Sequence, residues 1–190
     1  MTHSPRDTSR RQSAHTGHSA SVPQQLPPRP IPAPSALTRT RFLQLSEALT
    51  GYDDAELNGT GMVESYLGAL LSIVGEGMTA RLLQAWADLV EKAKEEPERV
   101  EALLVHLMAS DATLGPLTRN LAFLWYTGQW NQMPADWRDA HGASALDQTS
   151  ILSPESYVEG LVWKAIFTHP QGAKQPGYGS WALPPKGATP

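Results

Sequence analysis

The sequence predicts an all-α protein, a single domain of about six helices between two irregular ends. From residue 38 onward, apolar residues recur at helical spacing, and Gly or Pro stands where each recurrence stops. No segment alternates apolar and polar residues over the length of a strand, so no strand pair is expected. We divide the chain into a disordered, Pro-rich head at 1–36, a helical domain at 37–169 and an extended tail at 170–190.

The first expected helix covers residues 38–50, where Phe42, Leu45 and Leu49 share one face and Gly51 follows as a stop signal. Further apolar stripes predict helices at 62–74, 78–93, 97–108, 114–127 and 154–168.

Breaks separate these helices. Gly75 and Gly77 stand between the second and third, and Pro97 suits the first turn of the fourth. Gly128 ends the fifth, and Pro170 ends the sixth. The stretches 52–61 and 129–152 are expected to be loops, the second with Trp130 and Trp137 as bulky anchors.

The charge is distributed unevenly along the chain. Residues 1–41 hold six Arg and one Asp, a charge of +5, whereas residues 42–190 carry −9, which together give the net −4. Seven of the 16 Pro lie between Pro5 and Pro34, and few apolar residues accompany them. Such a head cannot bury enough surface to offset its chain entropy, so we expect it to be disordered.

Composition excludes several functions. With no Cys, disulfides, thiolate metal sites and a cysteine nucleophile are ruled out. A net charge of −4 argues against nucleic-acid binding, and no apolar run approaches the roughly 20 residues of a membrane span. Nucleotide-binding, P-loop, HExxH and GxSxG motifs are missing, and the carboxylate pairs lie in turns or at exposed helix ends, so no catalytic, cofactor or metal residue is predicted.

Aromatic residues gather in the last third of the chain. All Trp except Trp86 follow residue 124, and Tyr178 and Trp181 lie among Gly and Pro. Large rigid rings are typical anchors of protein interfaces. From the residues alone, the tail rings are expected to dock either on this domain or on another protein, and the two remain open.

Three blocks of the sequence are unusual: LWYTGQW at 124–130, SYVEGLVWKAI at 156–166 and HPQGAKQPGYGSW at 169–181. They resemble the small subunit of bacterial membrane-bound FAD-dependent sugar dehydrogenase complexes, which oxidise sorbitol, fructose or glucose. The opening FLQLSEALTG at 42–51 is similar to the first helix of that family, and the likeness covers about residues 38–185.

The resemblance implies a helical subunit without a cofactor, which stabilises a large subunit of the glucose–methanol–choline oxidoreductase type and assists its maturation and export. FAD is expected on that large subunit and haem c on a multi-haem cytochrome subunit. Contact with the membrane is then only indirect, through the complex. The residues expected at the partner interface are Trp125, Tyr126, Trp130, Trp163, His169, Tyr178 and Trp181.

Members of the family usually carry a twin-arginine export signal. This chain has Arg10-Arg11 but lacks the apolar stretch of about 7–15 residues that should follow. We therefore expect a place in the periplasm, at the inner membrane through the complex, or else in the cytoplasm. Two other functions stay open: a sugar dehydrogenase in its own right, and a free-standing export chaperone for the flavoprotein.

Overall fold

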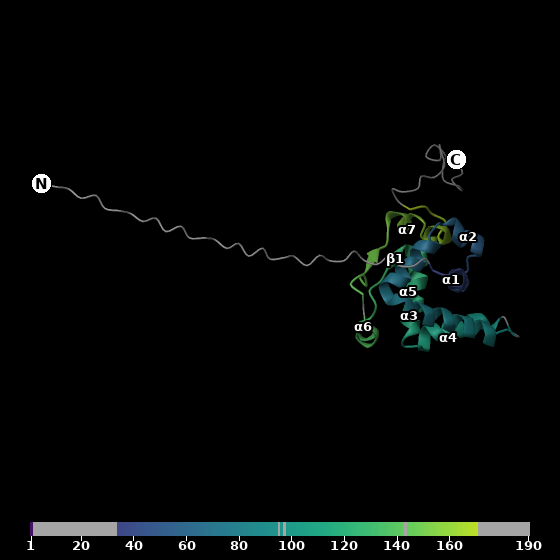
Figure 1. Cartoon of the computed structure of the whole chain (residues 1–190). Helices are drawn as coiled ribbons and strands as arrows, with labels where there is room; N and C mark the ends of the chain where they lie inside the picture. The colour runs from purple at the N-terminus through teal and green to yellow at the C-terminus, as the bar shows by residue number, and fades with distance from the viewer. Residues whose placement is uncertain (2–33, 95, 97, 143, 171–190) are drawn as a thin grey trace, which may run out of the picture. The chain divides into compact units, whose positions relative to one another are not determined.

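The computed structural model describes Met1 and residues 34–94, 96, 98–142 and 144–170. These residues are mostly helical (Figure 1), which confirms the predicted all-α fold class. The chain divides into two units, Met1–Ile31 and Pro32–Pro190, and all the described helices belong to the second. The predicted disordered head lies almost wholly outside the described residues, as does the extended tail beyond Pro170.

Helix α1 (Ala36–Thr50) begins and ends close to where the sequence predicts. The Ser35 hydroxyl caps its first turn by accepting a hydrogen bond from the Thr38 N–H at 3.1 Å. Gly51 ends it in the left-handed region, at φ 76°. Phe42 and Leu45, predicted on the inner face, are completely buried.

Helix α2 (Asp54–Gly59) occupies a stretch predicted to be a loop, so that prediction is wrong. Asp53 and Glu56 form a reciprocal capping box, in which each carboxylate accepts the backbone N–H of the other residue, at 2.8 and 3.1 Å. Leu57 is completely buried. A helix this short can be anchored by a single buried residue, and a single apolar residue produces no repeating pattern in the sequence.

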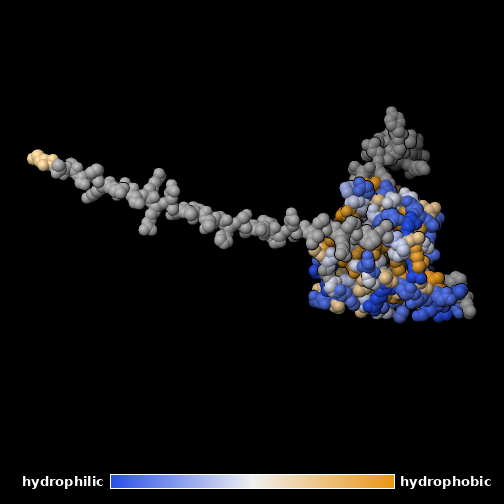
Figure 2. Space-filling model, in the orientation of Figure 1, coloured by the Kyte–Doolittle hydropathy of each residue, from blue (hydrophilic) through white to orange (hydrophobic). Residues whose placement is uncertain are grey.

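Helix α3 (Val63–Lys92) joins the two helices predicted at 62–74 and 78–93. The break between them is confined to Gly75, whose φ of 84° and ψ of 163° are not helical. Gly77, also predicted as a break, lies within the helix. Helix α4 (Arg99–Ser110) follows and contacts α3. The part of the molecule formed by α4 and the end of α3 has a largely hydrophilic surface (Figure 2).

Helix α5 (Leu114–Thr127) completes the core together with α1 and α3, which it contacts. Trp125 lies at the centre and is 1% exposed. Its ring meets Tyr66 edge-on, with centroids 4.8 Å apart, and its indole N–H donates to the Ser46 hydroxyl at 2.9 Å. That hydroxyl donates in turn to the Phe42 carbonyl at 2.8 Å, so the buried polar atoms of this centre are satisfied.

The stretch 129–152, predicted to be a loop, contains more structure than expected. Strands β1 (Gln129–Trp130) and β2 (Ser150–Ile151) pair antiparallel, and α6 (Ala135–His141) lies between them in the chain. The prediction of no strand pair is therefore wrong. Each strand is two residues long, too short for an alternating pattern to appear in the sequence. The two predicted anchors, Trp130 and Trp137, are both buried.

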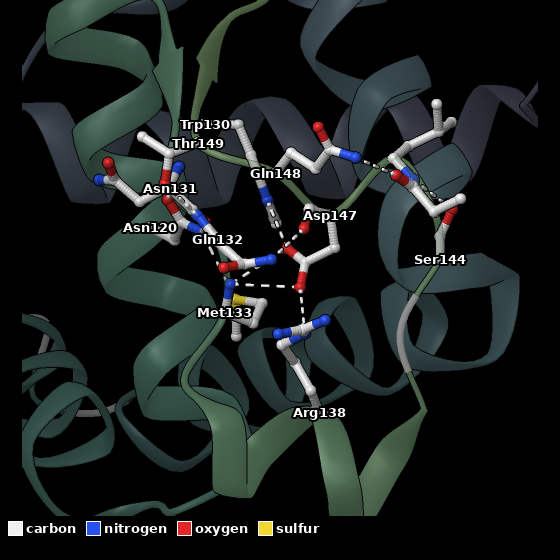
Figure 3. A network of polar contacts seen from close by, with 12 residues as sticks. Asn120, Trp130, Asn131, Gln132, Met133, Arg138, Ser144, Asp147, Gln148 and Thr149 are labelled. Carbon is white, nitrogen blue, oxygen red and sulfur yellow. Dashed lines mark hydrogen bonds and ion pairs between the residues drawn. The ribbon is translucent and has the colours of Figure 1, made fainter.

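A buried carboxylate holds this stretch together (Figure 3). Asp147 is 3% exposed and accepts hydrogen bonds from the Trp130 indole N–H at 2.9 Å and the Met133 N–H at 3.0 Å. The Arg138 guanidinium lies 3.3 Å from its other oxygen. Two buried N–H groups thus donate to this carboxylate and the guanidinium forms an ion pair with it, which makes Asp147 the structural centre of the stretch.

The last predicted helix, 154–168, is wrong in its extent, because the structure divides it into α7 (Pro154–Val158) and α8 (Leu161–Ala165). Ser153 caps α7 as predicted, with its hydroxyl 3.1 Å from the Ser156 N–H. Gly160 lies between the two helices. A Cβ there would stand 2.8 Å from the Tyr126 carbonyl oxygen, so the chain turns where only glycine fits against α5.

Candidate interaction surface

Helices α2 and α8, far apart in the sequence, are joined by charge. The Lys164 ammonium of α8 forms an ion pair with the Glu56 carboxylate of α2. The same ammonium lies 5.0 Å from the centre of the Tyr52 ring, within the range of a cation–π contact. The pair therefore fixes one edge of a surface built from α2, α7 and α8.

The two charges shift each other's proton equilibrium. The hydrogen bond from Lys164 lowers the pKa of Glu56, helped by the Asp53 backbone N–H. The hydrogen bond to Glu56 raises the pKa of Lys164. Both shifts favour the ionised forms, so the pair persists between the ordinary carboxyl and ammonium pKa values.

A hollow of about 390 Å³ opens beside this ion pair. Its walls come from α2, from the turn between α7 and α8, from α8 itself and from the segment that follows α8. The residues that line it include Tyr52, Glu56, Glu159, Trp163, His169 and Pro170. Tyr157 holds the Trp163 ring in place, because the indole N–H donates to the Tyr157 carbonyl at 2.7 Å and the two rings meet edge-on with centroids 5.3 Å apart.

The turn that ends α8 exposes two large apolar side chains. Phe167 has a φ of 55°, and among the described residues it is the one non-glycine with a positive φ. The N–H groups of Phe167 and Thr168 bond to the Lys164 and Trp163 carbonyls at 3.1 and 2.8 Å, the pattern in which glycine is normally found. The Phe167 side chain is 97% exposed, and that of Ile166 is 59% exposed.

Phe167 thus combines two unfavourable features. A left-handed conformation costs a non-glycine residue about 1–2 kcal/mol. Its ring also remains in water, where it contributes nothing to folding. Strained residues of this kind tend to cluster at functional sites.

His169, predicted at the partner interface, lies beyond the end of α8. It is half-buried and lines the hollow. Its Nδ1 is inaccessible to water and has no hydrogen-bond partner among the described residues. A buried ring nitrogen without a partner is uncommon and marks a place where a polar group could bind.

Two of the predicted interface residues lie in the core instead. Trp125 and Trp130 are 1% and 0% exposed, and both indole N–H groups already donate within the domain. Their contact role is therefore corrected to a structural one. The sequence could not separate them from surface rings, because an aromatic residue has the same pattern in a core as at an interface.

The other predicted interface residues divide into two groups. Tyr126 and Trp163 are half-buried, and the Tyr126 hydroxyl donates to the Thr50 carbonyl at 2.8 Å. Burial raises the pKa of Tyr126, and the neighbouring Tyr52 adds to the shift. Tyr178 and Trp181 lie outside the described residues.

Sequence reasoning missed Ile166 and Phe167. A continuous helix to residue 168 would have placed them on its surface without distinction. The signal in the sequence is Gly160, but one glycine inside a helical pattern is often tolerated, so it does not by itself predict the break that the structure has there.

The described residues contain neither a metal-binding cluster nor a membrane-spanning helix. No three His, Asp or Glu side chains there lie close enough together to hold a metal ion. Within the same residues, no helix has both the length and the apolar character needed to cross a membrane.

Comparisons of the chain with known protein families, with characterised proteins and with solved structures find no match.

Proposed function

We propose that this chain is the non-catalytic small subunit of an FAD-dependent sugar or polyol dehydrogenase complex. In this proposal it binds the flavoprotein large subunit, stabilises it and assists its maturation and export. FAD belongs to the large subunit and haem c to a multi-haem cytochrome subunit, and the complex works in the periplasm at the inner membrane. The three sequence blocks at 124–130, 156–166 and 169–181 support the choice of family.

The observation that carries the binding role is the strained, exposed Phe167. The domain keeps a ring that is 97% exposed in an unfavourable conformation, beside an exposed Ile166. An exposed aromatic of this kind suits a pocket in another protein. We therefore place the centre of the partner surface at Ile166–Phe167, from which it continues into residues 170–190.

Binding of this kind stabilises the partner by mass action. A protein that meets its partner at 100 times the dissociation constant gains about 2.7 kcal/mol of apparent stability. For a flavoprotein bound to the small subunit, that gain lowers the fraction of unfolded protein, from which FAD is lost. No chemical group of the small subunit has to take part in the reaction.

Phe167→Gly tests the proposal, because it separates binding from folding. The variant relieves the left-handed strain and removes no packing, so the free energy of unfolding should stay unchanged or rise by up to about 1 kcal/mol. Loss of an interface anchor should weaken binding to the large subunit by about 30-fold, or about 2 kcal/mol. The measurement is co-purification with the large subunit and the FAD content of that subunit.

Phe123→Ala is the matched control, since Phe123 is another exposed phenylalanine, at 42%, on α5. It should leave binding unchanged. The proposal fails if Phe167→Gly co-purifies with a fully FAD-loaded large subunit as well as the wild type does. It also fails if the purified chain shows flavin absorbance or oxidises sugars. Size exclusion of the mature complex separates a permanent subunit, which stays bound, from a chaperone, which leaves.

A further inference from the structure

We propose that a groove between α1 and α3 binds an extended segment of another protein, in which an acidic, an apolar and a basic residue stand at alternate positions. The groove has a volume of about 430 Å³, and its walls come from residues between 34 and 41 and between 71 and 84. None of its lining residues belongs to the Ile166–Phe167 surface or to the hollow beside α8. Binding here therefore goes beyond the proposed function, because a different surface carries it.

Arg41 provides the positive end of the groove. It is half-buried, and one guanidinium N–H donates to the Gln84 side-chain oxygen at 3.1 Å. The Gln84 amide donates in turn to the Asp88 carboxylate at 2.8 Å, which fixes the amide that orients the guanidinium. Arg41 forms no ion pair with any residue that the structure describes. A guanidinium has five N–H donors and pairs well with a carboxylate, so donors remain for an acidic group of the partner.

Glu76 provides the negative end. It is exposed, and its carboxylate forms no ion pair within the described part of the chain. Glu76 and Gln84 are eight residues apart in the part of α3 that follows the break at Gly75, which puts them about 12 Å apart along the helix axis. Water and salt screen charges over about 8–10 Å, so Arg41 and Glu76 do not neutralise each other.

The space between the two charges is apolar. Leu83 is 3% exposed and forms its floor, whereas Leu37 keeps 59% of its surface in water at the side. The polar groups of the walls have partners: the Ser35 and Thr38 hydroxyls bond to each other at 2.8 Å, and the Thr79 hydroxyl donates to a carbonyl of its own helix at 2.9 Å. The middle of the groove therefore favours an apolar side chain over a polar one.

An extended segment matches this spacing. A strand rises about 3.3 Å per residue and points every second side chain to the same face, so the first and fifth residues of a segment lie about 13 Å apart on one face. An acidic first residue then meets Arg41, an apolar third residue covers Leu37, and a basic fifth residue meets Glu76. A simple anion or an apolar molecule would leave at least one of the two charges of the groove without a partner.

The probe is the peptide Glu-Ser-Leu-Ser-Lys, with both ends blocked to remove their charges. It is titrated into the full-length protein, and binding is followed by ¹H–¹⁵N NMR. One buried leucine and two exposed ion pairs predict a Kd of about 1 mM. The largest shifts should be those of amides that line the groove. Glu-Ser-Ser-Ser-Lys, which lacks the leucine, should bind at least about fivefold more weakly.

Charge reversal tests each end through a gain of binding, which a misfolded variant cannot give. Arg41→Glu should weaken Glu-Ser-Leu-Ser-Lys at least about threefold and bind Lys-Ser-Leu-Ser-Lys at least about threefold better than the wild type does. Glu76→Lys should gain Glu-Ser-Leu-Ser-Glu by the same factor. Arg81→Glu is the matched control, because Arg81 is exposed on α3 and does not line the groove. It should change the Kd of each peptide less than about twofold.

Four results would overturn the proposal. The wild type could fail to bind the first peptide at several times the expected Kd, or bind the peptide without leucine equally well. Both charge reversals could leave the peptide preference unchanged. The peptide could shift amides around Ile166–Phe167 and not those of the groove. The groove amides could shift with protein concentration alone, which makes the occupant a second copy. None of these results depends on the large subunit, so they are separate from the test with Phe167→Gly.

Discussion

Asp147→Ala should lower the free energy of unfolding more than most single substitutions in the 129–152 stretch. The carboxylate serves two buried donors, the Trp130 indole N–H and the Met133 N–H, which are 0% and 3% exposed as residues. It also balances the half-exposed Arg138 at 3.3 Å. Alanine removes every acceptor at once.

The magnitude follows from those contacts. Each buried donor left without an acceptor costs about 1–3 kcal/mol. Two such donors are left here, but water that enters the space left by the carboxylate can bond to them and reduces the cost. The free energy of unfolding should therefore fall by about 3 kcal/mol. The exposed part of Arg138 adds little, because water screens its charge. For a body of this size the melting temperature should fall by about 9 °C.

Chemical denaturation followed by circular dichroism measures this loss. Asp139→Ala, on the exposed face of the same helix α6, is the matched control and should change the free energy of unfolding by less than about 0.5 kcal/mol. Asp147→Asn should fall between the two, because its amide keeps one acceptor oxygen. A loss below about 1 kcal/mol for Asp147→Ala would refute the role of this carboxylate as the centre of the 129–152 stretch.

Further substitutions test other parts of the fold. Gly128→Ala should cost about 4 kcal/mol in a denaturation series, because its Cβ would lie 2.1 Å from a backbone oxygen of α7. Gly51→Ala, with a similar left-handed φ of 76° and open space around its Cβ, should cost only about 1 kcal/mol. Glu56→Gln should remove a stabilisation that the wild type holds between about pH 4.5 and pH 10.5. Below that range the wild type loses this stabilisation because Glu56, whose folded-state pKa is lowered, takes up a proton. Above the range it loses the stabilisation because Lys164, whose pKa is raised, gives up a proton. The melting temperatures of the wild type and the variant should therefore converge at both ends of the range. Trp125→Phe loses a buried hydrogen bond and part of a ring, which should cost about 2 kcal/mol in the same denaturation assay; an unchanged midpoint would contradict its place at the centre of the core.

The WYTG block shows what a sequence pattern can and cannot reveal. Trp125 and Tyr126 of this block are predicted from the sequence to lie at the partner interface, yet both have a structural task in the domain, as does Gly128. Trp125 fills the core, the Tyr126 hydroxyl bonds to the end of α1, and Gly128 ends α5 at a φ of 70° where α7 passes. A structural and a binding block look alike in sequence, since both need large rings beside a glycine.

The candidate surface was predictable only in part. The sequence correctly indicated the C-terminal third of the chain, and Trp163 and His169 do line the hollow. It did not indicate Phe167, because exposure and a left-handed backbone arise only after Gly160 divides the expected helix. Nor did it pair Glu56 with Lys164, which stand on helices far apart in the chain.

The sequence by itself determined the helical class, the start and end of α1 and α5, and the break at Gly75. These depend on local spacing of apolar residues and on glycine and proline, which act over a few residues. Tertiary structure alone decided which aromatic rings are buried, how the 129–152 stretch folds around Asp147, and which side chains form a surface. Those outcomes depend on contacts between segments that are far apart in the chain, and the local sequence of neither segment predicts the energy of such a contact.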